Sequence, residues 1–434
     1  MFARYNQEMR HTLVSTAVLL TAMIGVLLSR SISLRAAIVP VQSTVTFSQH
    51  IAPLIYANCT ACHREGETAP FSLTNYAEAK KHAKQMADVT SRRIMPPWRA
   101  EIGHGDFLGE RRLTKSQIAQ LQQWVKDGCP EGDRAATPEP PKFTSGWQLG
   151  EPDLIVKMSD PYTLQAEGRD RYECFAIPIH IPEGKYLKAV EFRPGNRRIV
   201  HHAVLATLKH GMADWMMKAG GGKSFSSGLV APGDRLPGSL GLWTPGYEAR
   251  PLPEGYAAEW PTDCDLVLQL HLHPSGKPEV EQSTVGLHLT SEKPSGKMKS
   301  MVMLDKSLDI APGNGNYEIR ESKTLKSAVD AYGIFPHMHL LGRTVDVTAA
   351  LPDGTTRPMI SVRDWDFNWQ NYYQYAKPFR LPAGTRLDAR WTFDNSASNP
   401  ANPSQPPRRV TFGEQTTNEM AALILDVMPV KDVK

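Results

Sequence analysis

Several features that would assign this chain to a class are missing from its 434 residues. There is no concentrated stripe of Lys and Arg with interleaved aromatics, and the formal net charge is only +4, so nucleic acid is not expected as a partner. Apolar residues make up 41% and charged residues 22%, as in ordinary globular proteins, which argues against extensive disorder. No internal repeat is visible. A chain of this length should form about two to four domains.

Long hydrophobic runs are also scarce. The run Leu13–Leu28 covers about 16 residues, which is short for a bilayer span and close to the core of a signal peptide. Arg4 and Arg10 precede it. We interpret residues 1–37 as a signal peptide, with an uncleaved membrane anchor as the alternative. No cysteine directly follows the run, which argues against a lipoprotein anchor. In both cases the rest of the protein is expected to be periplasmic or otherwise extracytoplasmic.

Only five cysteines are present, and two stand in Cys59-Thr60-Ala61-Cys62-His63. The pattern Cys-x-x-Cys-His attaches haem c: the thiols add to the haem vinyl groups and the histidine becomes an axial iron ligand. A redox dithiol and half of a zinc site are the alternatives for Cys-x-x-Cys alone. Export agrees with the haem interpretation. We therefore predict one covalent haem c.

Among the other three cysteines a disulfide between Cys174 and Cys264 is expected, which leaves Cys129 without a partner in the prediction.

Residues 44–134 are predicted to be a compact helical block around this haem. One helix, capped by Ser48, leads into the haem motif, and a second begins with a capping box of Thr114 and Gln117. Between them the two prolines of Ile94-Met95-Pro96-Pro97-Trp98 predict an extended segment that presents Met95 as the sixth iron ligand. His82 and His104 are rival ligands, and Met95 could instead be a core residue. The block resembles a small class I cytochrome c.

Residues 135–149 are interpreted as a linker, because Pro, Glu and Thr predominate at their start. Beyond it no long amphipathic helix is expected. Short β-type runs separated by turn residues predict two antiparallel β-sandwiches, at 150–300 and 301–434. The predicted strands are Leu187–Phe192, Ile199–Thr207, Leu266–His273, Val345–Leu351, Arg386–Phe393 and Ala421–Val427.

Histidines cluster in three of these places. Strand residues two apart point to the same face, so His337 with His339, and His271 with His273, can each grip one ion. The adjacent pair His201-His202 can share a metal only at a strand end or a bulge. Imidazole-rich sites suit zinc, copper, iron or nickel, and the spacing does not choose among them.

From about Gly150 to Val430 the chain resembles the copper type II, ascorbate-dependent monooxygenases, the family of peptidylglycine α-hydroxylating monooxygenase and dopamine β-monooxygenase. The matching pieces occur in the family's order. They are the His-His strand, Leu266–His271, His337-Met338-His339 followed by Leu-Gly, Trp365–Gln370, Asp394-Asn395-Ser396 with Asn399-Pro400, and Asn418-Glu419-Met420. The resemblance implies two jelly-roll-like β-sandwiches that face each other across a wet cleft, with one copper on each.

Carried over by position, the resemblance implies that His201, His202 and His271 hold an electron-storing copper. It implies an oxygen-activating copper held by the residues His337, His339 and Met420. Gln269 matches a family glutamine near the route between the coppers, whereas His273 has no counterpart as a ligand. The peptide-amidating enzyme has an arginine where this chain has Phe335 and a tyrosine where it has Ile424, so an apolar or aromatic substrate is favoured over a glycine-terminated peptide.

These patterns predict an exported monooxygenase that hydroxylates a C–H bond of a small organic substrate with dioxygen. The haem would relay electrons to the coppers from an ascorbate-like reductant or a redox protein. The alternative is a non-catalytic electron-transfer or redox-sensing cytochrome whose β-domains bind copper or serve for docking.

Overall fold

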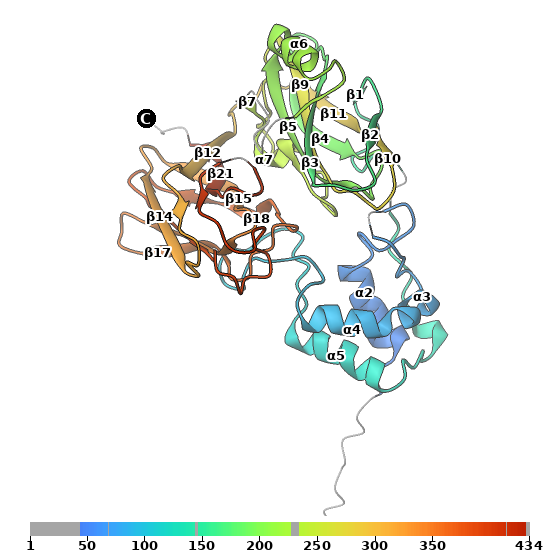
Figure 1. The fold of residues 1–434 in the computed structure, drawn as a ribbon. Helices are drawn as coiled ribbons and strands as arrows, with labels where there is room; N and C mark the ends of the chain where they lie inside the picture. Colours follow the sequence, from blue (N-terminus) through green and yellow to red (C-terminus); the bar gives the residue numbers. More distant parts are fainter. Residues whose placement is uncertain (1–43, 68, 144–145, 227–233, 414, 431–434) are drawn as a thin grey trace, which may run out of the picture. The chain divides into compact units, whose positions relative to one another are not determined.

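The computed structural model describes residues 44–67, 69–143, 146–226, 234–413 and 415–430 (Figure 1). The predicted signal peptide or anchor at 1–37 lies outside these ranges. Among the described residues no helix is both long enough and apolar enough to cross a bilayer. From Thr46 onward the chain forms one compact unit.

Helices dominate the first part of this unit, drawn in blue to cyan in Figure 1. Apolar residues three or four apart, such as Ile51 with Ile55 and Leu121 with Trp124, are buried and give these helices their shared core. The elements are η1 (Phe47–Ile51), α2 (Ala52–Asn58), α3 (Tyr76–Lys81), α4 (Ala83–Ser91), α5 (Lys115–Lys126) and the short η2 (Arg134–Ala136).

The predicted helix ends are correct in one case and wrong in the other. Thr114 and Gln117 form the capping box of α5, and Gly128 follows its end with a φ of 82°. Ser48, in contrast, lies inside η1, where Thr46 occupies the N-cap position. The Ser48 hydroxyl donates instead to the carbonyl of Glu131 at 2.9 Å, so it ties the start of the block to its end.

The first group of strands forms an antiparallel sheet in the order β6-β3-β9-β5-β7, with β8 also paired to β5, and a three-stranded sheet β1-β11-β4. Buried aliphatic side chains from both sheets form a single core, as alternation along the strands predicts. The bounds are β1 (Leu154–Lys157), β2 (Tyr162–Leu164), β3 (Arg171–Ile177), β4 (Tyr186–Arg193), β5 (Val200–Lys209), β6 (Phe225–Ser226), β7 (Asp234–Arg235), β8 (Leu242–Trp243), β9 (Cys264–Leu272), β10 (Glu279–Glu281) and β11 (Thr284–Thr290).

Two short helices accompany these strands: the ten-residue α6 (His210–Ala219) follows β5, and a single turn, α7 (Gly238–Gly241), precedes β8. The disulfide expected in this region is wrong. The cysteines Cys174 and Cys264 are not bridged to each other. The register of β3 and β9 places Cys174 opposite Gln269, five positions along β9 from Cys264. At about 3.4 Å per residue that separation is about 17 Å, far beyond the reach of a disulfide.

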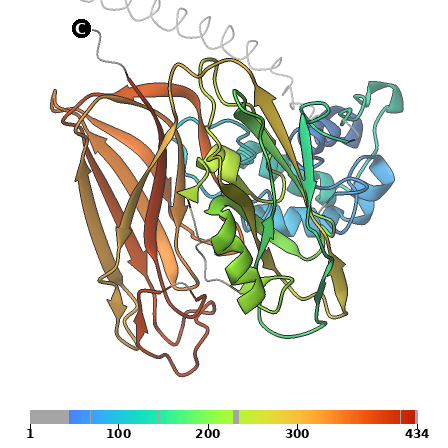
Figure 2. The same ribbon diagram turned by 90° about the horizontal axis from the view of Figure 1, so that it is seen from above.

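The second group of strands forms two four-stranded antiparallel sheets, β12-β21-β15-β18 and β14-β19-β16-β17. Figure 2 shows these strands, in orange to red, as two facing layers, and their inward side chains form one core. The bounds are β12 (Lys299–Asp305), β13 (Asp309–Ile310), β14 (Tyr317–Thr324), β15 (Val329–His337), β16 (Gly342–Ala350), β17 (Thr356–Val362), β18 (Tyr373–Leu381), β19 (Arg386–Phe393), β20 (Val410–Thr411) and β21 (Ala421–Pro429). All six predicted runs are strands.

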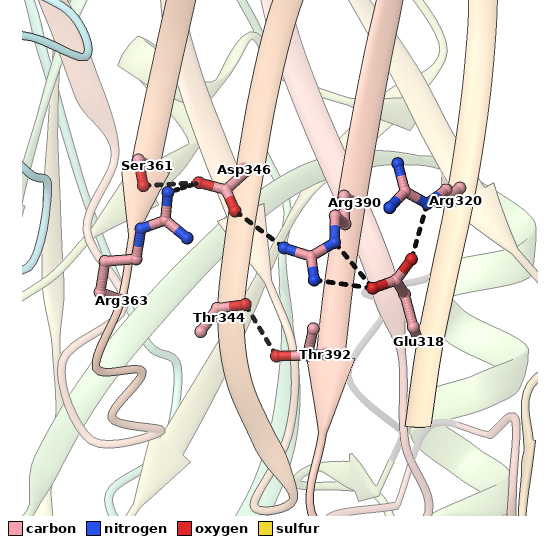
Figure 3. A network of polar contacts seen from close by, with 8 residues as sticks. All are labelled: Glu318, Arg320, Thr344, Asp346, Ser361, Arg363, Arg390 and Thr392. Carbon is pink, nitrogen blue, oxygen red and sulfur yellow. Dashed lines mark hydrogen bonds and ion pairs between the residues drawn. The ribbon is translucent and has the colours of Figure 1, made fainter. Parts of the chain in front are cut away.

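The outer face of the sheet β14-β19-β16-β17 is a polar ladder (Figure 3). Arg390 lies between Glu318 at 2.7 Å and Asp346 at 3.5 Å, and Arg363 reaches Asp346 from the neighbouring strand end at 3.0 Å. These side chains are partly exposed, so each pair contributes at most about 1 kcal/mol. The ladder identifies the solvent side of the sheet, and the opposite face carries the core.

One segment of the helical part belongs to this second core. Trp98, Ala100 and Phe107 are buried among its side chains, and the Trp98 ring meets Tyr373 edge-on at 5.2 Å. Backbone bridges pair Ala100 with Val362 and Phe107 with Tyr375. The chain therefore leaves the helices after α4, adds residues 98–108 to the β-sandwich, and returns for α5.

Candidate metal and haem centres

The Cys-x-x-Cys-His residues line a cavity of about 290 Å³ within the helical part. Aliphatic side chains of α2, α4 and α5, including Ile55, Val89 and Leu121, make up much of its wall, together with Met95. The two thiols are not joined in a disulfide, and burial raises the pKa of Cys59 to about 12, so it is held as a neutral thiol. An apolar cavity with two adjacent thiols fits a covalently attached porphyrin.

The His63 ring is oriented for iron. Its Nδ1 lies 3.2 Å from the carbonyl oxygen of Phe71, so Nδ1 carries the proton and Nε2 is the nitrogen that a metal would take. Burial lowers the pKa of His63, which keeps the ring neutral.

Met95 lines the same cavity, whereas the rival ligands His82 and His104 are not among its lining residues. The His82 ring stacks on Phe71, with the two ring centres 3.8 Å apart. Among the three predicted alternatives, only Met95 is placed to meet a group bound there.

His201, His202 and His271 form a compact cluster, which we call the three-histidine cluster. Their ligand atoms all lie within 4.8 Å of one another, and the Nδ1 of His202 is 3.3 Å from the Nδ1 atoms of both other rings. Nitrogens bound at about 2.0 Å to one ion in tetrahedral directions lie about 3.3 Å apart, so two of the three pairs already have the spacing of metal ligands.

The adjacent pair converges because β5 is irregular at that point. The register between β5 and β9 shifts between Val200 and His202, so His201 occupies a bulge and both neighbours turn to the same side. His202 pairs directly with His271 on β9. Burial lowers the pKa of His201 to about 4, helped by the neighbouring His271, and a neutral imidazole is the form that binds metal.

Asp170, which the sequence did not single out, fixes the orientation of His271. One carboxylate oxygen lies 2.7 Å from His271 Nε2, and the other lies 2.8 Å from His273 Nδ1. The contact to Nε2 makes Nδ1 the metal-facing nitrogen of His271. His273 is mostly exposed and outside the cluster, which agrees with its interpretation as a bystander. Burial acts to raise the pKa of Asp170, but the two histidines outweigh it and hold that pKa below its usual value.

Replacing Asp170 by asparagine should therefore weaken copper binding at the three-histidine cluster by about 10- to 100-fold, the usual effect of removing a carboxylate behind a ligating histidine. Competition titration of the purified protein with a copper chelator measures this. The exposed Asp160 in the neighbouring loop gives the matched control, because Asp160→Asn makes the same charge change away from the cluster. Equal affinities in the two variants would contradict a positioning role.

The second predicted site, which we call the His–Met cluster, comprises His337, His339 and Met420. His337 at the end of β15 pairs with Ala422 on β21, and His339 and Met420 lie just beyond the paired ends of these strands. One oxygen of Glu419 accepts the backbone N–H groups of both His339 and Met420, so these two residues are neighbours. The two imidazoles are 5.1 Å apart between ring centres, and Met420 is 5% exposed.

Both rings of the His–Met cluster have their Nδ1 occupied. His337 Nδ1 lies 2.6 Å from Gln370 Oε1, and His339 Nδ1 lies 3.1 Å from the carbonyl oxygen of Asn418. The Nε2 atom of His339 is buried and makes no hydrogen bond within the described part of the protein. Burial lowers the pKa of His339 to about 4. A neutral ring with a buried Nε2 is the arrangement a metal ion would complete.

Glu419 holds this cluster together from behind. Its fully buried carboxylate accepts backbone N–H groups from His339 at 2.8 Å, Leu341 at 2.6 Å and Met420 at 3.0 Å. One side chain thus fixes the backbone on both sides of the cluster. The stretch Asn418-Glu419-Met420 had been noted, but only Met420 was assigned a role. A lone acidic residue just before the apolar strand run Ala421–Val427 was the available signal.

The two clusters open onto one small space. A cavity of about 60 Å³ is lined by His202 of the first cluster, His337 of the second, and mainly aliphatic or aromatic neighbours such as Leu205 and Phe335. Phe335 pairs across the strands with Ile424, so the two positions that depart from the peptide-amidating enzyme are neighbours beside His337. Gln269 is buried two positions before His271 on β9 and is not among the residues lining this cavity.

No family model matches the sequence, and no curated protein matches it. Among solved structures, similarity is found to the major capsid protein P2 of bacteriophage PM2, with 10% identity, 65% of this chain and 98% of that chain covered, and a TM-score of 0.24. PNGF-II shares 9% identity over 64% of this chain and 65% of its own, with a TM-score of 0.25. The VP2 subviral particle of infectious bursal disease virus shares 13% identity over 64% and 72%, with a TM-score of 0.19. Likenesses this distant carry no functional argument.

Proposed function

We propose that this protein is a haem c- and copper-containing monooxygenase that hydroxylates a C–H bond of a small organic substrate with dioxygen. The observation that supports the proposal is the compact cluster of His201, His202 and His271 near the pair His337 and His339, with His202 and His337 lining one cavity. The cytochrome c character of the helical part and an extracytoplasmic location belong to the same proposal.

Copper, when bound, would supply dioxygen activation at the His–Met cluster and electron storage at the three-histidine cluster. The donor sets suit these tasks, because a thioether favours Cu(I) and three imidazoles accommodate both oxidation states. Gln370 and the carbonyl of Asn418 hold the two rings of the His–Met cluster by their Nδ1 atoms. Glu419 fixes the backbone beneath them, so the site is organised before substrate arrives.

The cavity between the clusters determines what can bind. Its space of about 60 Å³ beside His337 admits a group of only a few heavy atoms, and its walls are mainly apolar. Phe335 adds an aromatic ring 6.0 Å from the His337 ring, and Ile424 faces it from β21. These residues would exclude water from the reacting C–H group and offer no partner for a carboxylate. The proposed substrate therefore places an aliphatic or benzylic C–H bond here.

Copper content gives the direct prediction. The purified protein, loaded with copper and dialysed, should hold two copper ions per chain, because the clusters are separate and each is preorganised. His201→Ala and His337→Ala should each retain one, measured by elemental analysis. The two variants are matched controls for each other, because each substitution removes one imidazole from a different cluster.

Catalysis needs a further measurement. With a reductant, the copper-loaded protein should consume oxygen and place one atom of labelled dioxygen into a product, found by comparing metabolites of wild-type and Met420→Ile cells. Two coppers per chain without product formation would favour the electron-transfer alternative. A chain that binds no copper would favour the docking alternative.

A further inference from the structure

Six residues between β17 and β18 contact all three proposed centres; we call Trp365–Gln370 the bridging segment. At its end Trp369 lines the haem cavity beside the Cys-x-x-Cys-His residues. The backbone of the preceding residue, Asn368, lies beside the ring of His201. A residue that lines the haem cavity is thus the chain neighbour of a residue that adjoins the three-histidine cluster.

Phe367 continues the connection. Its ring, 6% exposed, has its centre 6.0 Å from that of His271 and 6.0 Å from that of His339. It therefore packs between a ligand of the three-histidine cluster and a ligand of the His–Met cluster. Gln370 reaches back to the Phe367 carbonyl at 3.0 Å while contacting His337. Consecutive residues connect the three centres in order.

The bridging segment is held in place from the haem side. The guanidinium of Arg99 donates to Asp364 and to Asp366, each at 2.8 Å, and the side chain of Arg99 is only 9% exposed. Just beyond the segment, the amide of Asn371 donates to the carbonyl of Pro97, two residues after Met95. These contacts fix both ends, so the path does not depend on a mobile loop.

We propose that Trp369, Asn368 and Phe367 form the electron route from the haem to the three-histidine cluster and on to the His–Met cluster. The inference rests on the proposed function. Each transfer oxidises one ferrous haem iron to ferric and reduces one cupric ion to cuprous, with no bond made or broken. The external one-electron donor is of the ascorbate-like or redox-protein class. Electronic coupling falls off much more slowly through covalent bonds, hydrogen bonds and packed rings than through empty space, which favours this path.

The test uses the full-length protein with haem reduced by dithionite, excess reductant removed, and oxygen absent. Cupric ion is then supplied and haem oxidation is followed by its visible absorption in stopped flow. Trp369→Leu should slow the copper-dependent oxidation by about tenfold or more, equivalent to about 1.4 kcal/mol in the barrier. Trp215→Leu is the matched control: it makes the same change on α6, where Trp215 is 64% exposed and lines neither the haem cavity nor the cavity beside His337. Its rate should stay close to wild type.

Two further variants separate the outcomes. Trp369→Phe keeps a ring in the haem cavity and should give a rate between those of wild type and Trp369→Leu. It replaces Trp369→Leu as the test if that variant folds poorly. When an ascorbate-like donor then supplies a second electron to the haem, Phe367→Leu should leave the first haem oxidation unaffected. It should slow the loss of the cupric EPR signal of the His–Met cluster. Wild-type rates in both Trp369 variants would overturn the route while leaving the proposed function intact. A wild-type haem that cupric ion does not oxidise would overturn the route and the haem relay together.

Discussion

Glu419→Ala should lower the free energy of unfolding by at least about 3 kcal/mol and abolish copper binding at the His–Met cluster. The substitution leaves three buried backbone N–H groups, those of His339, Leu341 and Met420, without their acceptor, and each such loss costs about 1–3 kcal/mol. Urea denaturation of the metal-free protein measures the stability, and elemental analysis should find one copper per chain instead of two.

Glu281 offers the control for Glu419. It is equally buried, and its carboxylate accepts the backbone N–H groups of Gly195 at 3.0 Å and Asn196 at 2.6 Å in the first sandwich. Glu281→Ala should destabilise the protein comparably but keep both coppers. Glu419→Gln, which retains one acceptor oxygen, should fall between wild type and Glu419→Ala. Two coppers in Glu419→Ala would show that the cluster does not depend on this carboxylate.

Replacing both Cys59 and Cys62 by serine should remove all covalently bound haem and loosen the helical part. Without a haem, the cavity of about 290 Å³ would cost up to about 7 kcal/mol at about 24 cal/mol per Å³, so the helices should close in or fray instead of standing open. Haem staining on denaturing gels tests the attachment, and far-ultraviolet circular dichroism with limited proteolysis tests the helices.

Cys129→Ser provides the comparison for that double substitution. Cys129 is buried near the end of the helical part but lies outside the cavity lining, so its replacement should leave the haem stain unchanged. A double variant that still carried covalent haem would show that Cys-x-x-Cys-His is not the attachment site. A dithiol or zinc role for the motif would then regain weight.

Much of the fold could be predicted because period-two alternation in the longer strands is strong. Runs such as Leu266–His273 and Arg386–Phe393 are bounded by turn residues and correspond to β9 and β19, with only the end residues His273 and Arg386 exposed. The condition that His201 and His202 share a metal only at a bulge also agrees with the register shift beside them. In these strands the local sequence pattern and the tertiary packing favour the same arrangement of side chains.

What could not be predicted depends on contacts between distant segments. Asp170 meets His271 across 101 positions, and Arg99 meets Asp366 across 267, so neither pairing leaves a local pattern. The two cysteines of the predicted disulfide do lie in neighbouring strands. The prediction was wrong because the register of β3 against β9, which local sequence does not determine, places them far apart. The helix α6 was missed because its ten residues carry exposed Met212 and Trp215, which blur the amphipathic signal.

The insertion of residues 98–108 into the second sandwich has a consequence for how this protein can evolve. A redox module joined only by a linker can be gained, lost or exchanged as a cassette. Here Trp98 and Phe107 fill space that the strands leave open, so deleting the helical part with its segment 98–108 would leave a hole in the second sandwich. Selection on either half therefore constrains the other, and descendants of this chain should keep or abandon the two together.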